Sequence, residues 1–194
     1  MKRINDIFYS LQGEGFHTGT PAVFVRFAGC NLACPWCDTE YHDYTAMTDE
    51  DIIATVNTLV TSQTDCLAVK PIIVLTGGEP AIQLDKRFID LLHEHGYIVC
   101  VETNGTMPLP DNIDWITCSP KDGSHLTLTH VDELKVVYTG KDPEAWLNKL
   151  SADHLFIQPL ATPEGDNREE VVRYALLHPR WRVSMQVHKL LGIK

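Results

Sequence analysis

Short apolar runs that each stop at small or polar residues recur along this sequence, and they constrain its fold more than any other feature. The clearest runs cover residues 22–27, 71–76, 97–101, 115–118 and 154–157. Helical patterns separate several of them: one begins after a capping Thr48 and continues to about residue 61, and another covers about 82–95. Strands that alternate with helices predict a mainly parallel sheet with right-handed crossover connections.

Residues suited to a binding site directly follow these predicted strands. They are the cysteine-rich segment after residue 27 and the segments 77–79, 102–104, 119–121 and 158–159. In barrels and open parallel sheets, sites are built at the carboxyl ends of the strands. A complete eight-fold barrel usually needs about 250 residues, whereas this chain has 194. We therefore expect one α/β domain over residues 1–194, a partial, open TIM-type β/α barrel of about six mainly parallel strands.

The composition excludes several classes of protein. The chain is 44% hydrophobic and 22% charged, which is ordinary for a globular domain that buries a core. Its 16 Lys and Arg against 26 Asp and Glu give a net charge of −10, which argues against direct binding to nucleic-acid backbone. No apolar run reaches the roughly 18–20 residues needed to span a bilayer, and polar residues follow the first three. We expect a cytoplasmic protein with no membrane or nucleic-acid partner.

The six cysteines are unevenly distributed. Cys30, Cys34 and Cys37 lie within eight residues, whereas Cys66, Cys100 and Cys118 are isolated and are interpreted as structural thiols. In a reducing cytosol, clustered cysteines favour metal binding or catalysis over disulfides. Three thiolates could bind zinc with His17 or His42 as the fourth ligand. They could equally hold a [4Fe-4S] cluster with one iron open to a ligand from outside the protein. The number of ligands alone leaves both interpretations open.

Two further motifs make a resemblance specific. Trp36 precedes the third cysteine, and Gly77-Gly78-Glu79-Pro80 follows the second predicted strand. Together with the Cys-x3-Cys-x2-Cys spacing, they resemble the signature of the radical S-adenosylmethionine superfamily. The resemblance implies that Cys30, Cys34 and Cys37 hold a [4Fe-4S] cluster whose open iron binds the amino and carboxylate groups of S-adenosylmethionine.

The sequence is also similar, from residue 11 to its carboxyl terminus, to one family within that superfamily. The features that carry this similarity are the LQGEG motif at residues 11–15, Arg26, the segments 37–39, 76–79, 119–121 and 158–159, and the ending Gln186-x-His188-Lys189. They resemble the 7-carboxy-7-deazaguanine synthases. The implied reaction converts 6-carboxy-5,6,7,8-tetrahydropterin to 7-carboxy-7-deazaguanine with loss of ammonia, a step toward queuosine. The resemblance also implies a homodimer and an electron donor such as flavodoxin or ferredoxin.

The same resemblance implies roles for individual residues. Glu14 and Arg26 would be catalytic, and Arg26 suits a carboxylate because a guanidinium can bind it through two hydrogen bonds. The other residues implied in binding the pterin are Leu11, Gln12, Gly13, Thr76, His188 and Lys194. Those implied in binding S-adenosylmethionine are Trp36, Cys37, Asp38, Gly78, Glu79, Glu102, Asn104, Ser119, Pro120, Lys121, Gln158 and Pro159. Thr39 would bind Mg²⁺, a cation that prefers oxygen ligands.

Other functions and plainer structural roles compete with this interpretation. An activase that places a glycyl radical on a partner protein shares the cysteine spacing, although we know no reason for it to carry LQGEG. A zinc-binding module without catalysis would explain the cysteines alone. Arg26 could be an outward charge on an alternating strand, and Glu79 could be an acid favoured at a helix start.

Overall fold

A single curved sheet forms the centre of the protein. The computed structural model describes residues 1–37, 39–65, 69–162 and 165–194. In these ranges nine strands pair in the order β11-β8-β7-β6-β5-β4-β2-β1-β3. Their bounds are β1 (Lys2–Leu11), β2 (Pro21–Phe27), β3 (Thr45–Met47), β4 (Ile72–Gly77), β5 (Val99–Thr103), β6 (Trp115–Cys118), β7 (His130–Tyr138), β8 (Ser151–Pro159) and β11 (Trp181–Val183). Strands β9 (Ala161–Thr162) and β10 (Gly165–Asp166) form a separate small ladder.

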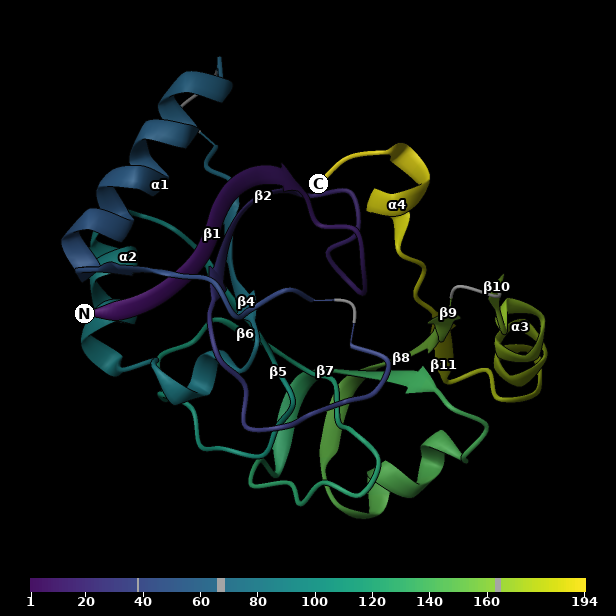
Figure 1. The fold of residues 1–194 in the computed structure, drawn as a ribbon. Coiled ribbons are helices and arrows are strands. Elements are labelled where there is room, and N and C mark those ends of the chain that lie inside the picture. Colours follow the sequence, from purple (N-terminus) through teal and green to yellow (C-terminus); the bar gives the residue numbers. More distant parts are fainter. Residues whose placement is uncertain (38, 66–68, 163–164) are drawn as a thin grey trace.

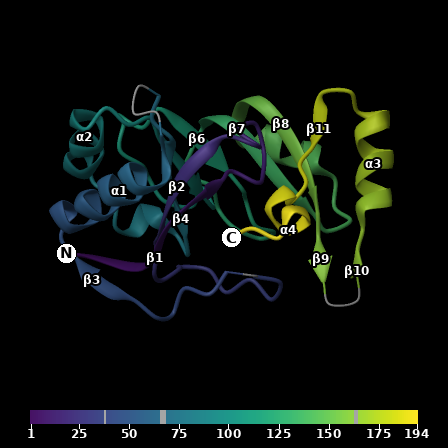
Figure 2. The same ribbon diagram turned by 90° about the horizontal axis from the view of Figure 1, so that it is seen from above.

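The strand directions confirm the predicted partial barrel. Seven of the described strands run parallel to their neighbours: β2, β4, β5, β6, β7, β8 and β11. β1 and β3 add antiparallel pairs at one edge of the sheet. The order ends at β11 and β3, so the sheet curves without closing (Figures 1 and 2). These seven parallel strands agree with the expectation of about six mainly parallel strands.

The helices cover the outer face of this sheet in two groups. α1 (Asp49–Gln63) and α2 (Lys86–Glu94) lie over the half that contains β2, β4 and β5, where Val56 and Phe88 are fully buried. α3 (Arg168–Leu177) and the 3-10 helix η2 (Pro143–Asn148) cover β7, β8 and β11, where Val171 is fully buried and Trp146 nearly so. None of the helices among the described residues has the length and apolar character needed to cross a membrane.

Local capping sets where these helices begin. Thr48 accepts a hydrogen bond from the Asp51 N–H and so caps α1, as predicted. The helix predicted from about residue 82 instead begins at Lys86, because Asp85 caps it through the Phe88 N–H at 2.9 Å. The residues before it form the 3-10 helix η1 (Pro80–Ile82). The apolar pattern continued through this turn, so it predicted a helix that was too long.

The inner face of the sheet is partly polar and carries the site. Along β2 and β4, Val23, Val25 and Leu75 face the helices, and the alternate residues Arg26 and Thr76 therefore face inward. α4 (Val187–Leu191) and the C-terminus lie between β1 and β8 on the open side of the barrel (Figure 2). Ser10 Oγ donates a hydrogen bond to the backbone oxygen of Lys194, which anchors this end of the chain.

Candidate active site

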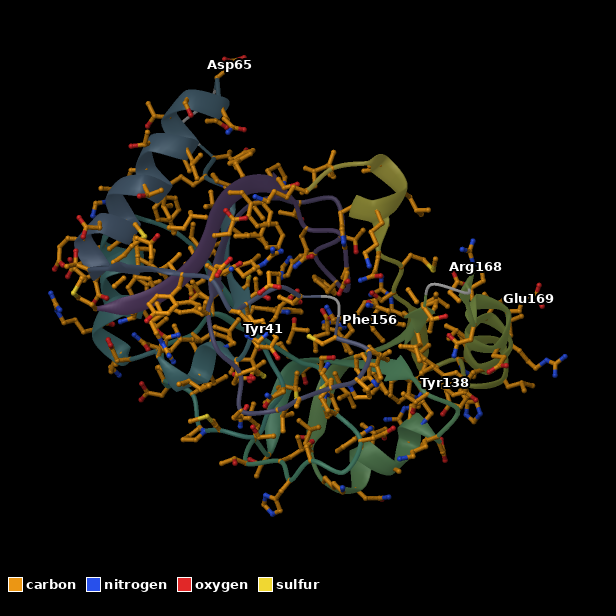
Figure 3. All side chains as sticks on the ribbon, in the orientation of Figure 1. Tyr41, Asp65, Tyr138, Phe156, Arg168 and Glu169 are labelled. Carbon is orange, nitrogen blue, oxygen red and sulfur yellow. The ribbon has the colours of Figure 1, made fainter. Side chains whose placement is uncertain are left out.

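Two adjoining cavities lie on the inner face of the sheet. The first is at the carboxyl ends of the parallel strands, and all three clustered cysteines line it together with Tyr41. In Figure 3, Tyr41 lies near the centre of the molecule, well away from Arg168 and Glu169 on α3. The second cavity lies among β1, β2 and α4. Five residues line both cavities and form the wall that the two share: Glu14, Thr39, Thr76, Glu102 and Gln186.

The structure gathers most residues predicted to bind S-adenosylmethionine around the first cavity. Those that line it are Trp36, Cys37, Gly78, Glu102, Asn104, Ser119, Lys121 and Gln158. Glu79, Pro120 and Pro159 do not line it, and Asp38 lies outside the described residues. All eight residues predicted to bind the pterin line the second cavity: Leu11, Gln12, Gly13, Glu14, Arg26, Thr76, His188 and Lys194.

Neutral hydrogen bonds hold the cysteine loop, residues 29–37, against the sheet. Asn31 donates to Thr106 Oγ1 at 2.8 Å and accepts a bond from Asn104 Nδ2 at 3.0 Å. The loop also needs glycine opposite it, since a Cβ on Gly78 would lie 2.0 Å from the backbone oxygen of Gly29. Burial raises the pKa of the Cys34 thiol, and the nearby Lys121 opposes this shift.

Glu79 lies behind the lining of the first cavity and binds residues that form it. Its side chain is fully buried and accepts bonds from Thr103 Oγ1 at 2.7 Å, the Asn104 N–H at 2.7 Å and the Ala81 N–H at 3.0 Å. Burial raises the pKa of Glu79, and these hydrogen bonds oppose the shift. In this structure Glu79 orients the neighbouring backbone of Asn104 and does not itself face the cavity.

A buried group of charges lies where the two cavities meet. We call Glu14, Glu102, Glu133 and Lys135 the charged layer. The Lys135 ammonium lies 2.5 Å from Glu14 Oε2 and 3.5 Å from Glu102 Oε1. Burial alone would lower the pKa of Lys135, but the three carboxylates raise it, so this side chain stays charged. For Glu14, burial favours a higher pKa, but Lys135 and Gln186 hold the pKa below its ordinary value.

Both glycines of LQGEG are required by close packing. A Cβ on Gly13 would lie 2.2 Å from His188 Nδ1. Gly15 has a φ of 66°, and a Cβ there would lie 2.0 Å from Glu133 Oε1. The motif is therefore a tight turn that packs between α4 and β7 and places Glu14 at the junction of the cavities.

Comparisons with known proteins agree with this arrangement. Residues 24–152 match the model of the Radical SAM superfamily. The chain is 52% identical to the 7-carboxy-7-deazaguanine synthase of Bacteroides thetaiotaomicron and 42% identical to that of Nitratidesulfovibrio vulgaris. These alignments cover 100% of both chains in the first case and 98% of both in the second. This chain belongs to the 7-carboxy-7-deazaguanine synthase family of the Radical SAM superfamily. A crystal structure of QueE from Escherichia coli matches with a TM-score of 0.78 and 29% identity, covering 96% of this chain and 94% of that one.

Membership in the superfamily implies a [4Fe-4S] cluster and S-adenosylmethionine, and the donor set of the first cavity fits them. Cys30, Cys34 and Cys37 are free cysteines that all line this cavity, and its described lining contains no histidine. Within the described ranges, no three His, Cys, Asp or Glu side chains are gathered in a way that could hold one metal ion. A cluster offers a separate iron to each cysteine, and three free cysteines around one cavity fit that ligand set.

Neither candidate zinc ligand, His17 or His42, lines the first cavity. His17 packs with Phe16 and Trp115 on the inner face of the sheet, and His42 packs against Tyr41. Of the cysteines interpreted as structural, Cys100 and Cys118 are buried, which confirms that interpretation for both. Cys66 lies outside the described residues.

The sequence analysis assigned no role to three residues of the site, although it named Gln186 in the ending that carries the resemblance. Lys135 and Gln186 line the first cavity, and Glu133 is buried on β7 two residues from Lys135. Glu133 and Lys135 lie on one face of β7, on either side of Leu134. Two opposite charges spaced two residues apart in a predicted strand were the available signal.

Proposed function

We propose that this protein catalyses the conversion of 6-carboxy-5,6,7,8-tetrahydropterin to 7-carboxy-7-deazaguanine with loss of ammonia. The reaction is a carbon–nitrogen lyase step with contraction of a ring, on the way to queuosine and related deazapurines. The observation that carries the proposal is the wall shared by the two cavities. A cofactor in the first cavity and a substrate in the second would meet at Glu14, Thr76 and Glu102.

Residues of the second cavity suit a flat, polar substrate that bears a carboxylate. The Arg26 guanidinium lies 5.2 Å from the centre of the Phe8 ring, and both residues line the cavity. Arg26 would bind the substrate carboxylate. Glu14, kept ionised by Lys135, would accept hydrogen bonds from N–H groups of the pterin, with Gln12 and His188 as further contacts.

Residues of the first cavity would hold the cofactors. The three cysteines would hold the cluster, while Gly78, Asn104, Ser119, Lys121 and Gln158 would orient S-adenosylmethionine. The chemistry that these cofactors supply when bound is reductive cleavage of S-adenosylmethionine and abstraction of a hydrogen atom from the substrate. The chain itself would fix the direction of that abstraction by orienting the two ligands toward each other at the residues that line both cavities.

Further features belong to the same proposal. Thr39 lines both cavities, which supports a Mg²⁺ site beside the substrate. An electron donor such as flavodoxin or ferredoxin would reduce the cluster, and the active form would be a cytoplasmic homodimer.

The test is anaerobic reconstitution with iron and sulfide, followed by incubation with a reductant, S-adenosylmethionine and the carboxytetrahydropterin. We expect equal amounts of ammonia and 7-carboxy-7-deazaguanine, measured by an enzymatic ammonia assay and by mass spectrometry. A reaction without S-adenosylmethionine serves as the control. Formation of 5′-deoxyadenosine without consumption of the pterin would show that the substrate assignment is wrong.

A further inference from the structure

Both carboxylate oxygens of Glu14 are held by other side chains. Oε2 lies 2.5 Å from Lys135 Nζ, and Oε1 accepts a hydrogen bond from Gln186 Nε2 at 2.9 Å. A carboxylate held at both oxygens cannot rotate freely. Its remaining lone pairs therefore have a defined direction at the junction of the two cavities.

The backbone that follows Glu14 is held just as firmly. The Phe16 N–H donates to Glu133 Oε2 at 2.9 Å. The Gly15 N–H donates to Ser184 Oγ at 3.0 Å, and this hydroxyl in turn donates to Gln158 Oε1 at 2.9 Å. The turn that carries Glu14 is thus held by a side chain from β7 and by Ser184, which directly follows β11.

β7 supplies one anchor for the side chain of Glu14 and one for the backbone. Glu133 and Lys135 lie two residues apart on the same face of the strand and are only 2% and 4% exposed. Glu133 Oε1 has no hydrogen-bond partner among the described residues, and Gly15 packs directly against it. Buried charges of this kind are often no more stabilising than apolar residues of similar size. Stability alone therefore does not account for this pair.

We propose that Glu133 and Lys135 are positioning residues that together aim Glu14 at the substrate. Lys135 sets the direction of the Glu14 carboxylate, and Glu133 fixes the turn from which it projects. Because Lys135 also lies 3.5 Å from Glu102, it holds the shared wall of both cavities in one arrangement. The inference deepens the proposed function and rests on it, since Glu14 acts there as a substrate contact.

The first test replaces Lys135. In the reconstituted enzyme, K135M should raise the KM for the carboxytetrahydropterin about ten- to hundredfold, the effect of losing one charge-assisted hydrogen bond. The kcat, the cluster absorbance and the affinity for S-adenosylmethionine should change much less. K135R should restore part of the KM. An unchanged KM in K135M, or an equal loss of S-adenosylmethionine affinity, would overturn the assignment.

The second test distinguishes the protonated side chain of Glu133 from the ionised one. An amide oxygen can still accept the Phe16 N–H bond. Well below pH 7, where Glu133 is protonated, the KM of E133Q should therefore lie close to that of wild type, whereas that of E133A should be higher. Burial raises the pKa of Glu133 to about 7, against the opposing effect of Lys135. Above pH 7 an ionised Glu133 would repel Glu14 and Glu102 and compete for Lys135. The wild-type KM should therefore rise with pH while that of E133Q stays flat. Parallel profiles would contradict the inference.

A third readout does not depend on turnover. Hydrogen exchange at the Phe16 amide should be faster in E133A than in wild type and close to wild type in E133Q. Equal exchange in E133A and wild type would overturn the role of Glu133. If wild type binds the cluster and S-adenosylmethionine but does not consume the pterin, the proposed function fails. The exchange result then still decides whether β7 holds the turn.

Discussion

The cysteine loop and the charged layer both border the first cavity, but they are built differently. In the cysteine loop, Cys37 is exposed, Cys30 and Cys34 are partly exposed, and neutral bonds through Asn31 attach the loop to the sheet. In the charged layer, Lys135 is 4% exposed and forms ionic contacts with carboxylates from other strands and loops.

This difference in burial and bonding indicates what stabilises the conformation of each region. A loop with accessible thiols and few buried contacts gains its stability from the group that it binds. Buried ions are costly unless they are paired, so the charged layer must form together with the fold. We therefore expect the first region to be organised by its cofactor and the second to be organised before any ligand binds. Four substitutions test this contrast, from the largest expected effect to the smallest.

Cys34→Ala should abolish both the iron–sulfur absorbance and all turnover, because two cysteines cannot replace three in holding the cluster. Ultraviolet–visible spectra and product formation after anaerobic reconstitution measure this. Cys100→Ala is the matched control: Cys100 is 4% exposed and packs in a separate apolar group, so this variant should keep its cluster. Retention of cluster and turnover by Cys34→Ala would contradict the site assignment.

Glu133→Gln should make stability less dependent on pH. The pKa of Glu133 rises from 4.5 to about 7 on folding, so the folded state keeps a proton that the unfolded state loses between these values. The wild-type free energy of unfolding should therefore fall across this window by up to about 3 kcal/mol relative to the variant. Urea unfolding at pH 4 and pH 8 measures the difference, which should be near zero at pH 4. Equal differences at both pH values would show that Glu133 does not bind this proton.

Arg26→Ala should raise the KM for the pterin about ten- to hundredfold while the cluster stays intact, because a charged hydrogen-bond donor is lost from the second cavity only. Steady-state kinetics and the cluster spectrum test this. Arg87→Ala provides the control, since this arginine is 68% exposed and pairs with Glu50 on the outer surface. Loss of the cluster in Arg26→Ala would mean that Arg26 is structural.

Asn31→Ala should have the smallest effect, because it removes two neutral bonds of an exposed side chain. The loss should be about 0.5–1.5 kcal/mol, seen as a modest fall in Tm before reconstitution and a smaller one afterwards. Asn112→Ala, which removes bonds to Lys86 and Asp90 beside α2, controls for the loss of an amide. A fall in Tm that is equally large with and without the cluster would contradict the idea that the cofactor organises this loop.

The sequence alone predicted the features that depend on local pattern. Apolar runs identified most of the parallel strands, and the cysteine spacing and the Gly77-Gly78-Glu79-Pro80 motif identified the edge of the sheet that carries the site. β1 was missed, because Asn5, Asp6 and Ser10 interrupt its apolar pattern and its order comes from pairing with β2. α4 was missed because it has only five residues and no side-chain cap.

Only the tertiary structure decided how the junction of the two cavities is built. Lys135 lies 121 residues from Glu14 in the chain, and nothing local to either residue predicts that they meet. In the sequence, Gly13 and Gly15 merely permit a turn; in the fold, they leave room for His188 and Glu133. Strand patterns and metal-ligand spacing are short-range properties, which neighbouring residues reveal. Burial and charge pairing depend on which strands become neighbours, so they exist only once the sheet has formed.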